Sequence, residues 1–374
     1  MMNDCAAFVV APYGFGPTSK AIAISSHLPR SIRRIFFGDG PPLELARASR
    51  AFSKCTRLDF GMSTDEVAEI MSPYRTVVFV NTTRFLGVSS QTETSVVFVD
   101  TLAWIRGSWP SRLSTQSTYF AQRFFEHPFT LELESSECFR PTGAIVTKTL
   151  TEVRNRSGGT GKPPIVHCGG LYSPAIRPGA DVMFVTRLCK TLNEAGLAAR
   201  VVLPKHLHSQ VAPYVTKYLS LIDCSPMNVG EHIERSLLAL TTSGIEFTYE
   251  ATLLGVPTMF LPPFNATQLL QLRYYQDAFG DCIPFPLDKI RHSTAQSLDS
   301  DTDAIQQEGM CGAWTTQFEQ LGRCLKRTLS GSSLDALAAL QHQQCQAVSS
   351  VGSDGAGTIA AHILSKIERR LCLK

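Results

Sequence analysis

The stretch that decides the fold is residues 238–275, LALTTSGIEFTYEATLLGVPTMFLPPFNATQLLQLRYY. Residues 236–241 are a short apolar run that ends in small polar residues, as a buried parallel strand does. A helix is expected over residues 245–254, because Gly255 and Pro257 together form a helix stop. The stretch therefore begins with a strand, a turn and a helix.

The second half of the stretch repeats this order. Residues 256–261 predict another strand, and Pro262-Pro263 then takes the chain out of the sheet. A Gln-rich helix follows from about Ala266. In an open α/β sheet, ligands bind at the carboxyl ends of the strands, so both turns are candidate binding loops.

Polar and small residues at the first turn indicate what would bind there. Thr242, Ser243 and Gly244 expose backbone N–H groups at the start of the helix, and a helix N-terminus suits phosphate oxygens. Glu250, nearly two turns into the helix, could accept hydrogen bonds from ribose hydroxyls. This arrangement predicts a site for a nucleoside diphosphate.

These motifs resemble the donor-binding region of GT-B glycosyltransferases. The similarity is greatest to the peptidoglycan N-acetylglucosaminyltransferase and the UDP-glycosyltransferase group. Leu270 departs from the pattern, because the family has the first of two adjacent Gln residues there. The residues that carry the resemblance are Ser243-Gly244, Glu250, 251–257, Pro263-Phe264 and Gln271.

The resemblance implies both a fold and a set of roles. The expected fold is α/β, with two Rossmann-like domains whose parallel sheets face a cleft. By the same resemblance, Glu250 binds the ribose and Gln271 touches the donor sugar. Gly169 and Gly170, which end the strand IVHCGG, would face the donor diphosphate.

The first strand of the chain also runs into a glycine-rich turn. Residues 6–11 are apolar, and residues 12–19, PYGFGPTS, follow them. Gly14 and Gly16 let the backbone turn tightly and approach a ligand closely. The third glycine of the dinucleotide fingerprint is missing, so a nicotinamide cofactor is not expected.

Composition breaks predict where the domains divide. Residues 154–164, RNRSGGTGKPP, have no apolar periodicity and are expected to be a linker. The predicted organisation is an N-terminal acceptor-side domain over 1–153, a nucleotide-sugar domain over 165–355, and a C-terminal helix over 356–374 that crosses back to the first domain.

Overall composition excludes several classes of protein. The chain has 374 residues, 44% hydrophobic and 18% charged, which is typical of a globular protein of two domains. A net charge of +3 gives no argument for nucleic acid, and no apolar run is long enough to span a bilayer. The start of the chain reads as a strand rather than a signal peptide. Eleven scattered cysteines indicate reduced thiols and a cytoplasmic location, and none has zinc-site spacing.

Candidate catalytic residues are less clearly marked. Pro17 stands where the family has the histidine that acts as the base or lies beside it. Asp100, at the end of the strand VVFV, is the first candidate to replace it, and Asp39 is the second. A structural cap on a turn is an equally good interpretation of Asp100. His167 is expected to be a core residue, and His232 a possible phosphate contact.

The leading hypothesis is a glycosyltransferase that moves a sugar from a nucleotide-diphosphate donor to a small-molecule acceptor. It would be inverting, with no metal and no cofactor besides the nucleotide sugar. Two alternatives stay open: a sugar-nucleotide 2-epimerase or hydrolase of the same fold, and a non-catalytic nucleotide-sugar-binding partner subunit. The second alternative accommodates Pro17, because a binding protein needs no base.

Overall fold

The computed structural model describes most of the chain. The described residues are 5–90, 94–106, 108–114, 116–125, 127–147, 162–172, 177–222, 226, 228–287, 300–329 and 334–369. Of the predicted linker, residues 154–161 lie outside this part. The chain divides into two compact units, the first made of Met1–Glu152, Ser225–Met227 and Ser349–Lys374, and the second of Val153–Cys224 and Asn228–Val348.

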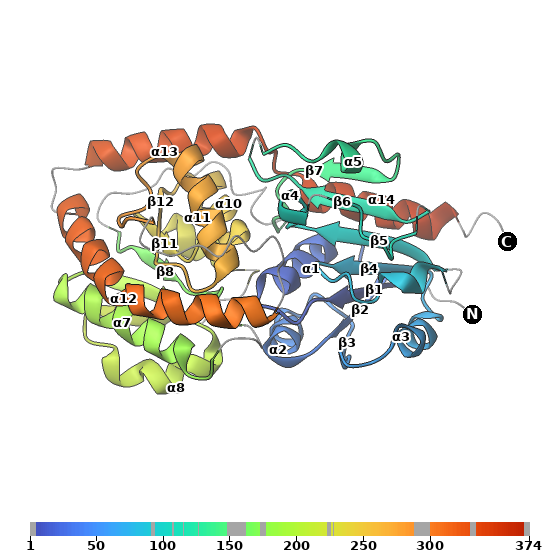
Figure 1. Ribbon diagram of the computed structural model, residues 1–374, viewed down its shortest axis with the longest axis horizontal. Helices are drawn as coiled ribbons and strands as arrows, with labels where there is room; N and C mark the ends of the chain where they lie inside the picture. The colour runs from blue at the N-terminus through green and yellow to red at the C-terminus, as the bar shows by residue number, and fades with distance from the viewer. Residues whose placement is uncertain are drawn as a thin grey trace. The chain divides into compact units, whose positions relative to one another are not determined.

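The first unit is built on a seven-stranded parallel sheet of order β3-β2-β1-β4-β5-β6-β7 (Figure 1). Its strands are β1 (Cys5–Val10), β2 (Arg33–Gly38), β3 (Lys54–Arg57), β4 (Thr76–Val80), β5 (Ser95–Asp100), β6 (Thr118–Gln122) and β7 (Phe139–Thr142). Its helices are α1 (Gly16–His27), α2 (Gly40–Ser49), α3 (Thr64–Met71), the short α4 (Ala103–Arg106) and α5 (Leu131–Glu134), the 3-10 turn η1 (Leu86–Ser90), and α14 (Gly355–Arg369).

The middle of this sheet is covered on both faces, as its sequence requires. All residues of β1 and β4 are buried, and both strands are almost entirely apolar. A strand that is apolar on both sides must have helices or loops over both faces. The order of the strands doubles back at β1, which pairs with β2 on one side and β4 on the other.

Helix α14, from the far end of the chain, completes the core of the first unit. Its residues Ile359 and Ile363 are fully buried in the same apolar cluster as α1 and the central strands. Two backbone hydrogen bonds fix its start: Ala144 donates to Gly352 at 2.8 Å, and Gly355 donates to Ala144 at 3.1 Å. Figure 1 shows α14 on the sheet of the first unit.

The second unit holds a five-stranded parallel sheet of order β10-β9-β8-β11-β12. Its strands are β8 (Ile165–His167), β9 (Ala199–Val202), β10 (Leu219–Ile222), β11 (Ala239–Thr241) and β12 (Thr258–Phe260). The helices are α7 (Ala180–Glu194), α8 (His208–Val211), α9 (Val229–Glu234), α10 (Ile245–Leu253), α11 (Ala266–Phe279), α12 (Ser300–Leu329) and α13 (Leu334–Ser349), with 3-10 turns η2 (Lys205–Leu207) and η3 (Ala212–Tyr214).

The two faces of this second sheet are packed differently. On one face, α7 and α12 pack around the buried ring of Trp314 and bury Val166 and Leu240. On the other face, α9 and α10 cover Ile165 and Ala239. These two residues alternate along the strands with Val166 and Leu240 of the first face. Because β8 lies between β9 and β11, its carboxyl end is at the centre of the sheet.

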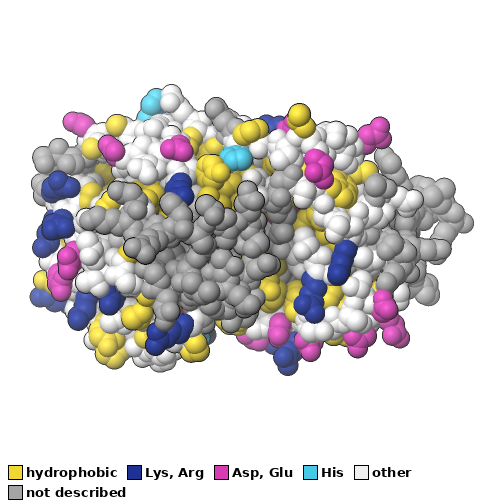
Figure 2. All heavy atoms as spheres, viewed as in Figure 1, with side chains coloured by type: hydrophobic (Ala, Val, Ile, Leu, Met, Phe, Trp, Pro, Cys, Tyr) yellow, Lys and Arg dark blue, Asp and Glu magenta, His cyan; other side chains and the backbone are white. Residues whose placement is uncertain are grey.

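The α/β fold with two parallel, Rossmann-like sheets is therefore confirmed. Element boundaries differ locally, and the strand predicted over residues 236–241 is only Ala239–Thr241. In the described part of the chain, no helix combines the length and apolar character needed to cross a bilayer. Figure 2 shows several Lys and Arg side chains near one another at the left of this face, and several Asp and Glu side chains near one another at its lower right.

Candidate functional site

The candidate donor site is at the carboxyl edge of the five-stranded sheet. Thr241 pairs with His167 on one side and with Phe260 on the other, so β8, β11 and β12 end at the same level. Three loops leave the sheet from this edge, over residues 168–171, 242–244 and 261–265. The first two carry the predicted donor contacts, and the third precedes α11.

Gln268, in the first turn of α11, ties these three loops together. Its Nε2 donates to the carbonyl of Gly170 at 3.1 Å, and its Oε1 accepts from the backbone N–H of Phe264 at 2.8 Å. Its own carbonyl accepts from the hydroxyl of Ser243 at 2.7 Å. The side chain is only 4% exposed, so each contact replaces water inside the protein.

Gly169 and Gly170 are required by packing at this edge. A Cβ on Gly170 would collide with Nε2 of Gln268 and lie 3.2 Å from the Thr242 hydroxyl. A Cβ on Gly169 would collide with the ring of His167. The structure thus explains both glycines by close approach of side chains, which leaves their predicted contact with the diphosphate as a separate hypothesis.

The turn at Thr242, Ser243 and Gly244 leads directly into α10. Thr242 and Ser243 are buried, and the Ser243 hydroxyl is committed to Gln268. Gly244 is the N-cap of α10, and no side chain caps this end of the helix. The first N–H groups of a helix have no partner within it, so this N-terminus is suited to bind an anion.

Glu250 and Gln271 lie deeper than their predicted roles suggest. Glu250, in the second turn of α10, is 2% exposed, and Gln271 on α11 is 5% exposed. Both belong to the helices that leave this edge, so the structure places them in the same region as the turn. Their predicted contacts with ribose and sugar remain hypotheses.

His167 was expected to be a core residue, and its surroundings are more specific than that. It ends β8, and its ring stacks on Phe247 of α10 with the centroids 4.1 Å apart. Its Nδ1 is buried and makes no hydrogen bond. Burial lowers the pKa of His167 to about 4, so the imidazole is neutral near pH 7.

His232 lies away from this edge, contrary to its proposed contact with phosphate. Its carbonyl accepts a 2.8 Å hydrogen bond from Arg200, which pairs with Ile165 at the amino end of β8. Burial is the largest cause of the lowered pKa of His232, and the charges of Arg200 and Arg235 lower this pKa further. The donor loops start at the opposite end of the strand.

The glycine-rich loop of the first unit joins β1 to α1 at a carboxyl strand end. Gly14 has φ 63°, a left-handed conformation that favours glycine. A Cβ on Gly16 would meet no atom within 4 Å, so packing does not require glycine there. Pro17 occupies the first turn of α1, where its missing N–H costs no helical hydrogen bond.

The two candidate bases are also at carboxyl strand ends, but in different surroundings. Asp100 is fully buried, and it accepts from the Tyr119 hydroxyl at 2.9 Å and from the Leu102 N–H at 2.8 Å. Asp39 follows β2 and pairs with Arg57 at 2.8 Å. Three strand spacings separate β2 from β5, about 14 Å, so the two carboxylates do not form one site.

Two other kinds of functional group were considered for this region, a metal centre and a nucleophilic cysteine. Among the described residues, no three His, Cys, Asp or Glu side chains are grouped to hold a metal ion. Cys168 follows His167 in the first loop, and burial raises the pKa of its thiol, so it is not a thiolate nucleophile at pH 7.

Comparisons with known proteins show the fold. No protein-family model matches the sequence, and no curated protein matches it significantly. Os79 from O. sativa in complex with UDP is similar in structure, with a TM-score of 0.59 and 13% identity over 96% of this chain and 100% of that chain. UGT2 from Phytolacca americana, complexed with UDP-2-fluoro-glucose and pterostilbene, has a TM-score of 0.58 and 12% identity over 97% of this chain and 99% of that chain. S. aureus MnaA with UDP has a TM-score of 0.54 and 10% identity over 99% of this chain and 98% of that chain.

Gly170→Ala should destabilise the second unit, because the new methyl group displaces the Gln268 carboxamide and breaks its bonds to Gly170 and Phe264. Overpacking of this kind costs about 1–3 kcal/mol in the free energy of unfolding. Urea unfolding measures it. Gly312→Ala is the matched control, since nothing lies within 4 Å of its Cβ and alanine favours the interior of α12. Equal stability of Gly170→Ala and the wild type would contradict the contact.

His167 should make the protein less stable in mild acid. Its folded-state pKa of about 4 lies below the ordinary value of 6.5, so its contribution is present above pH 6.5 and lost as the pH falls toward 4. Between pH 7 and pH 5 this amounts to about 2 kcal/mol. Urea unfolding at both pH values should show that His167→Gln, which does not titrate, has a pH dependence smaller by that amount. Identical pH dependence in both proteins would mean that the ring is not buried.

Proposed function

We propose that the chain is a glycosyltransferase that moves a sugar from a nucleotide-diphosphate donor to a small-molecule acceptor. The observation that carries the proposal is the N-terminus of α10. It has no side-chain cap, it lies at the carboxyl edge of a parallel sheet, and Glu250 follows in the same helix. The fold supports the proposal, because Os79 and UGT2 bind UDP or a UDP-sugar analogue on the same architecture.

The donor half of the reaction follows from this geometry. The first N–H groups of α10 would hold the diphosphate, and the positive end of the helix dipole would stabilise the negative charge that develops as the sugar leaves. Gln268 would keep the three loops in place before the donor arrives, so binding would not have to order them. This mode of stabilisation needs no metal ion.

The acceptor half would belong to the first unit. There, an inverting transfer needs a base near the acceptor hydroxyl. Asp100 is the candidate from the sequence, and its bond to Tyr119 makes a structural role the competing explanation.

The two alternative functions have their own support. A sugar-nucleotide 2-epimerase or hydrolase would bind a nucleoside diphosphate at the same sheet edge, and the similar MnaA structure was solved with UDP. Pro17 and the burial of Asp100 support a partner subunit that binds nucleotide sugar without turnover. Consumption of a nucleotide sugar distinguishes the enzymes from the binding protein, and analysis of the products distinguishes transfer, epimerisation and hydrolysis.

UDP should bind, and Glu250→Gln should weaken that binding. Loss of a charge-assisted hydrogen-bond pair is worth about 1.5–3 kcal/mol, so the dissociation constant should rise by about 10- to 150-fold. Isothermal titration calorimetry measures it. Glu194→Gln is the matched control, because Glu194 is the exposed last residue of α7. This variant should leave the affinity for UDP unchanged. An unchanged affinity in a folded Glu250→Gln protein would remove Glu250 from the site.

Asp100→Asn and Tyr119→Phe together separate the two roles of Asp100. Tyr119→Phe removes this buried hydrogen bond, and Asp100→Asn replaces its charged acceptor by a neutral amide, so each should lower the free energy of unfolding by about 1–3 kcal/mol. If Asp100 is also the base, Asp100→Asn alone should reduce sugar transfer by a further 10²–10⁴. Transfer is measured under single-turnover conditions and normalised to the folded fraction. Equal transfer rates for the two variants would assign Asp100 to the scaffold.

A further inference from the structure

His167 ends the central strand of the second sheet and lies beside the start of α10. Its carbonyl accepts a 3.4 Å hydrogen bond from the N–H of Thr242, in the turn before the helix. Its ring stacks on Phe247 with an angle of 2° between the ring planes. Phe247 is in the first turn of α10, and helical side chains lean toward the N-terminus of their helix. The stacked pair therefore lies against the end of α10 that is proposed to bind the diphosphate.

One edge of the His167 imidazole is open. The residue as a whole is half-buried, and its Nδ1 is sealed inside the protein whereas Nε2 is not. Within the described part of the chain, neither nitrogen has a hydrogen-bond partner. Gly169 keeps this edge open, because a Cβ there would lie 2.9 Å from Nε2. Nε2 is therefore a polar group that a ligand between the donor loops could contact directly.

The ring is neutral because of burial and not because of a neighbouring positive charge. Burial alone lowers the pKa of His167 to about 4. Its strand partners Val202 and Thr241 carry no charge, and Cys168 beside it is a neutral thiol. The charged or titratable residues on the surrounding β9, α9 and α10 are Arg200, Glu231, His232, Glu234, Glu246, Tyr249 and Glu250. A bound anion would change this state, since an opposite charge within about 4–6 Å stabilises the charged form of a group.

We propose that a nucleoside diphosphate bound at this edge takes up one proton from solvent at His167, whose Nε2 then donates to a phosphate oxygen. The imidazolium would add a positive charge beside the free N–H groups of α10, and its hydrogen bond to phosphate would be charge-assisted. This role rests on the proposed function, because it needs a diphosphate at the start of α10. It does not need sugar transfer, so it applies equally to an enzyme and to a binding protein.

Binding of the donor would then be stronger in mild acid. The ring of the free protein is neutral above about pH 4, and the diphosphate would return its pKa to about the ordinary value of 6.5. The added affinity is absent well above pH 6.5, grows as the pH falls through 6.5, and levels off below pH 4. Between pH 7.5 and pH 5.5 it amounts to about tenfold tighter binding.

UDP is the probe, and calorimetry on the full chain at pH 7.5 and pH 5.5 measures the effect. His167→Gln keeps a hydrogen-bond donor but cannot become charged. It should bind UDP within about twofold of the wild type at pH 7.5 and about tenfold more weakly at pH 5.5. Ionisation of the UDP phosphates affects both proteins alike, so the difference between them isolates His167.

His232→Gln is the matched control. Its pKa is also lowered, but it lies toward the amino ends of the strands, so this variant should keep the pH dependence of the wild type.

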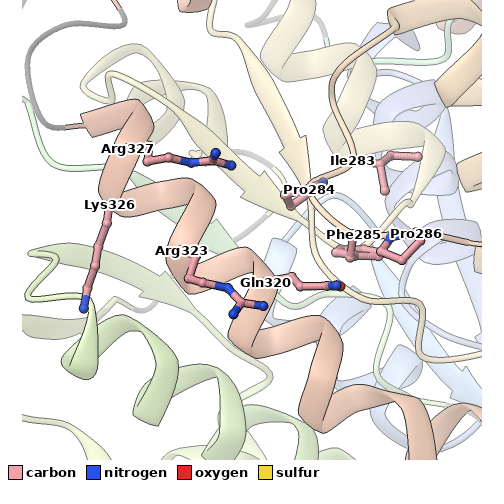
Figure 3. Close-up of a pocket in the computed structure, with 8 residues that line it drawn as sticks. All are labelled: Ile283, Pro284, Phe285, Pro286, Gln320, Arg323, Lys326 and Arg327. Carbon is pink, nitrogen blue, oxygen red and sulfur yellow. The ribbon is translucent and has the colours of Figure 1, made fainter.

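A second control tests for a general effect of positive charge. Figure 3 shows a hollow between α12 and the segment after α11, and none of the residues that line it belongs to the three donor loops. Arg323 is an exposed basic residue in this hollow. Arg323→Gln should therefore leave the pH dependence of UDP binding unchanged, and its loss in this variant would assign the effect to the hollow instead of His167.

A measurement on the wild type needs no variant at position 167. The protein has nine histidines, and ¹³C labelling resolves their Cε1–H resonances. One resonance that does not titrate between pH 7.5 and pH 5.5 in the free protein should titrate when UDP is saturating. The role of His167 is overturned if UDP binds but no histidine changes its titration, or if His167→Gln keeps the pH dependence of the wild type. Absence of UDP binding to the wild type at both pH values would overturn the proposed function together with this role.

Discussion

The carboxamide of Gln268 is the contact on which the edge of the second sheet depends, because it joins loops that follow three different strands. One end of the group donates to Gly170 after β8, and the other accepts from Phe264 after β12. The backbone carbonyl of the same residue accepts a hydrogen bond from the hydroxyl of Ser243, which follows β11. Loops on a protein surface are ordinarily the most mobile parts of a fold. Here a single buried side chain fixes their relative positions, and with them the N-terminus of α10.

The first unit depends in a similar way on residues from the far end of the chain. Helix α14 contributes buried isoleucines to the core beside α1, and its start is bonded to Ala144 after β7. A core that needs both ends of the sequence forms only after a long loop has closed, and loop closure is the entropically slow part of folding. The core of the first unit therefore cannot be complete until α14 has packed against α1.

The fold could be predicted from the sequence because its signals are local. Valine-rich runs mark β4 and β5, the apolar run SLLALT contains β11, and Gly255 with Pro257 marks the end of α10. β3, KCTR, has no such pattern, and it is a strand only because it pairs with β2 at the sheet edge. Edge strands are short and often charged, so sequence periodicity does not find them.

At the candidate site, the spacing of motif residues predicted the candidate donor region but did not identify Gln268, the residue that connects its loops. Family spacing directed attention to Gln271, whereas the contacts belong to Gln268. A local signal for Gln268 does exist: Asn265-x-x-Gln268 has the form of a capping box, and Asn265 does accept from the Gln268 N–H at 2.9 Å. The Gln268 side chain accepts from Phe264, one residue before the cap, so the motif closes the loop as well as the helix. Its bonds to Gly170 and Ser243 depend on tertiary structure, which spacing cannot encode.

The strand ends of the two units differ in how far their polar groups are already satisfied. In the first unit, Asp100 is bonded to Tyr119 and Leu102, and Asn81, held at φ 56°, exchanges two hydrogen bonds with Thr101. In the second unit, α10 starts at the sheet edge without a side-chain cap, whereas α11 at the same edge is capped by Asn265. Each oxygen of the Asp100 carboxylate thus already accepts one hydrogen bond, whereas the first N–H groups of α10 have no partner within the helix. The fold therefore prepares the binding of a donor more completely than it prepares a base.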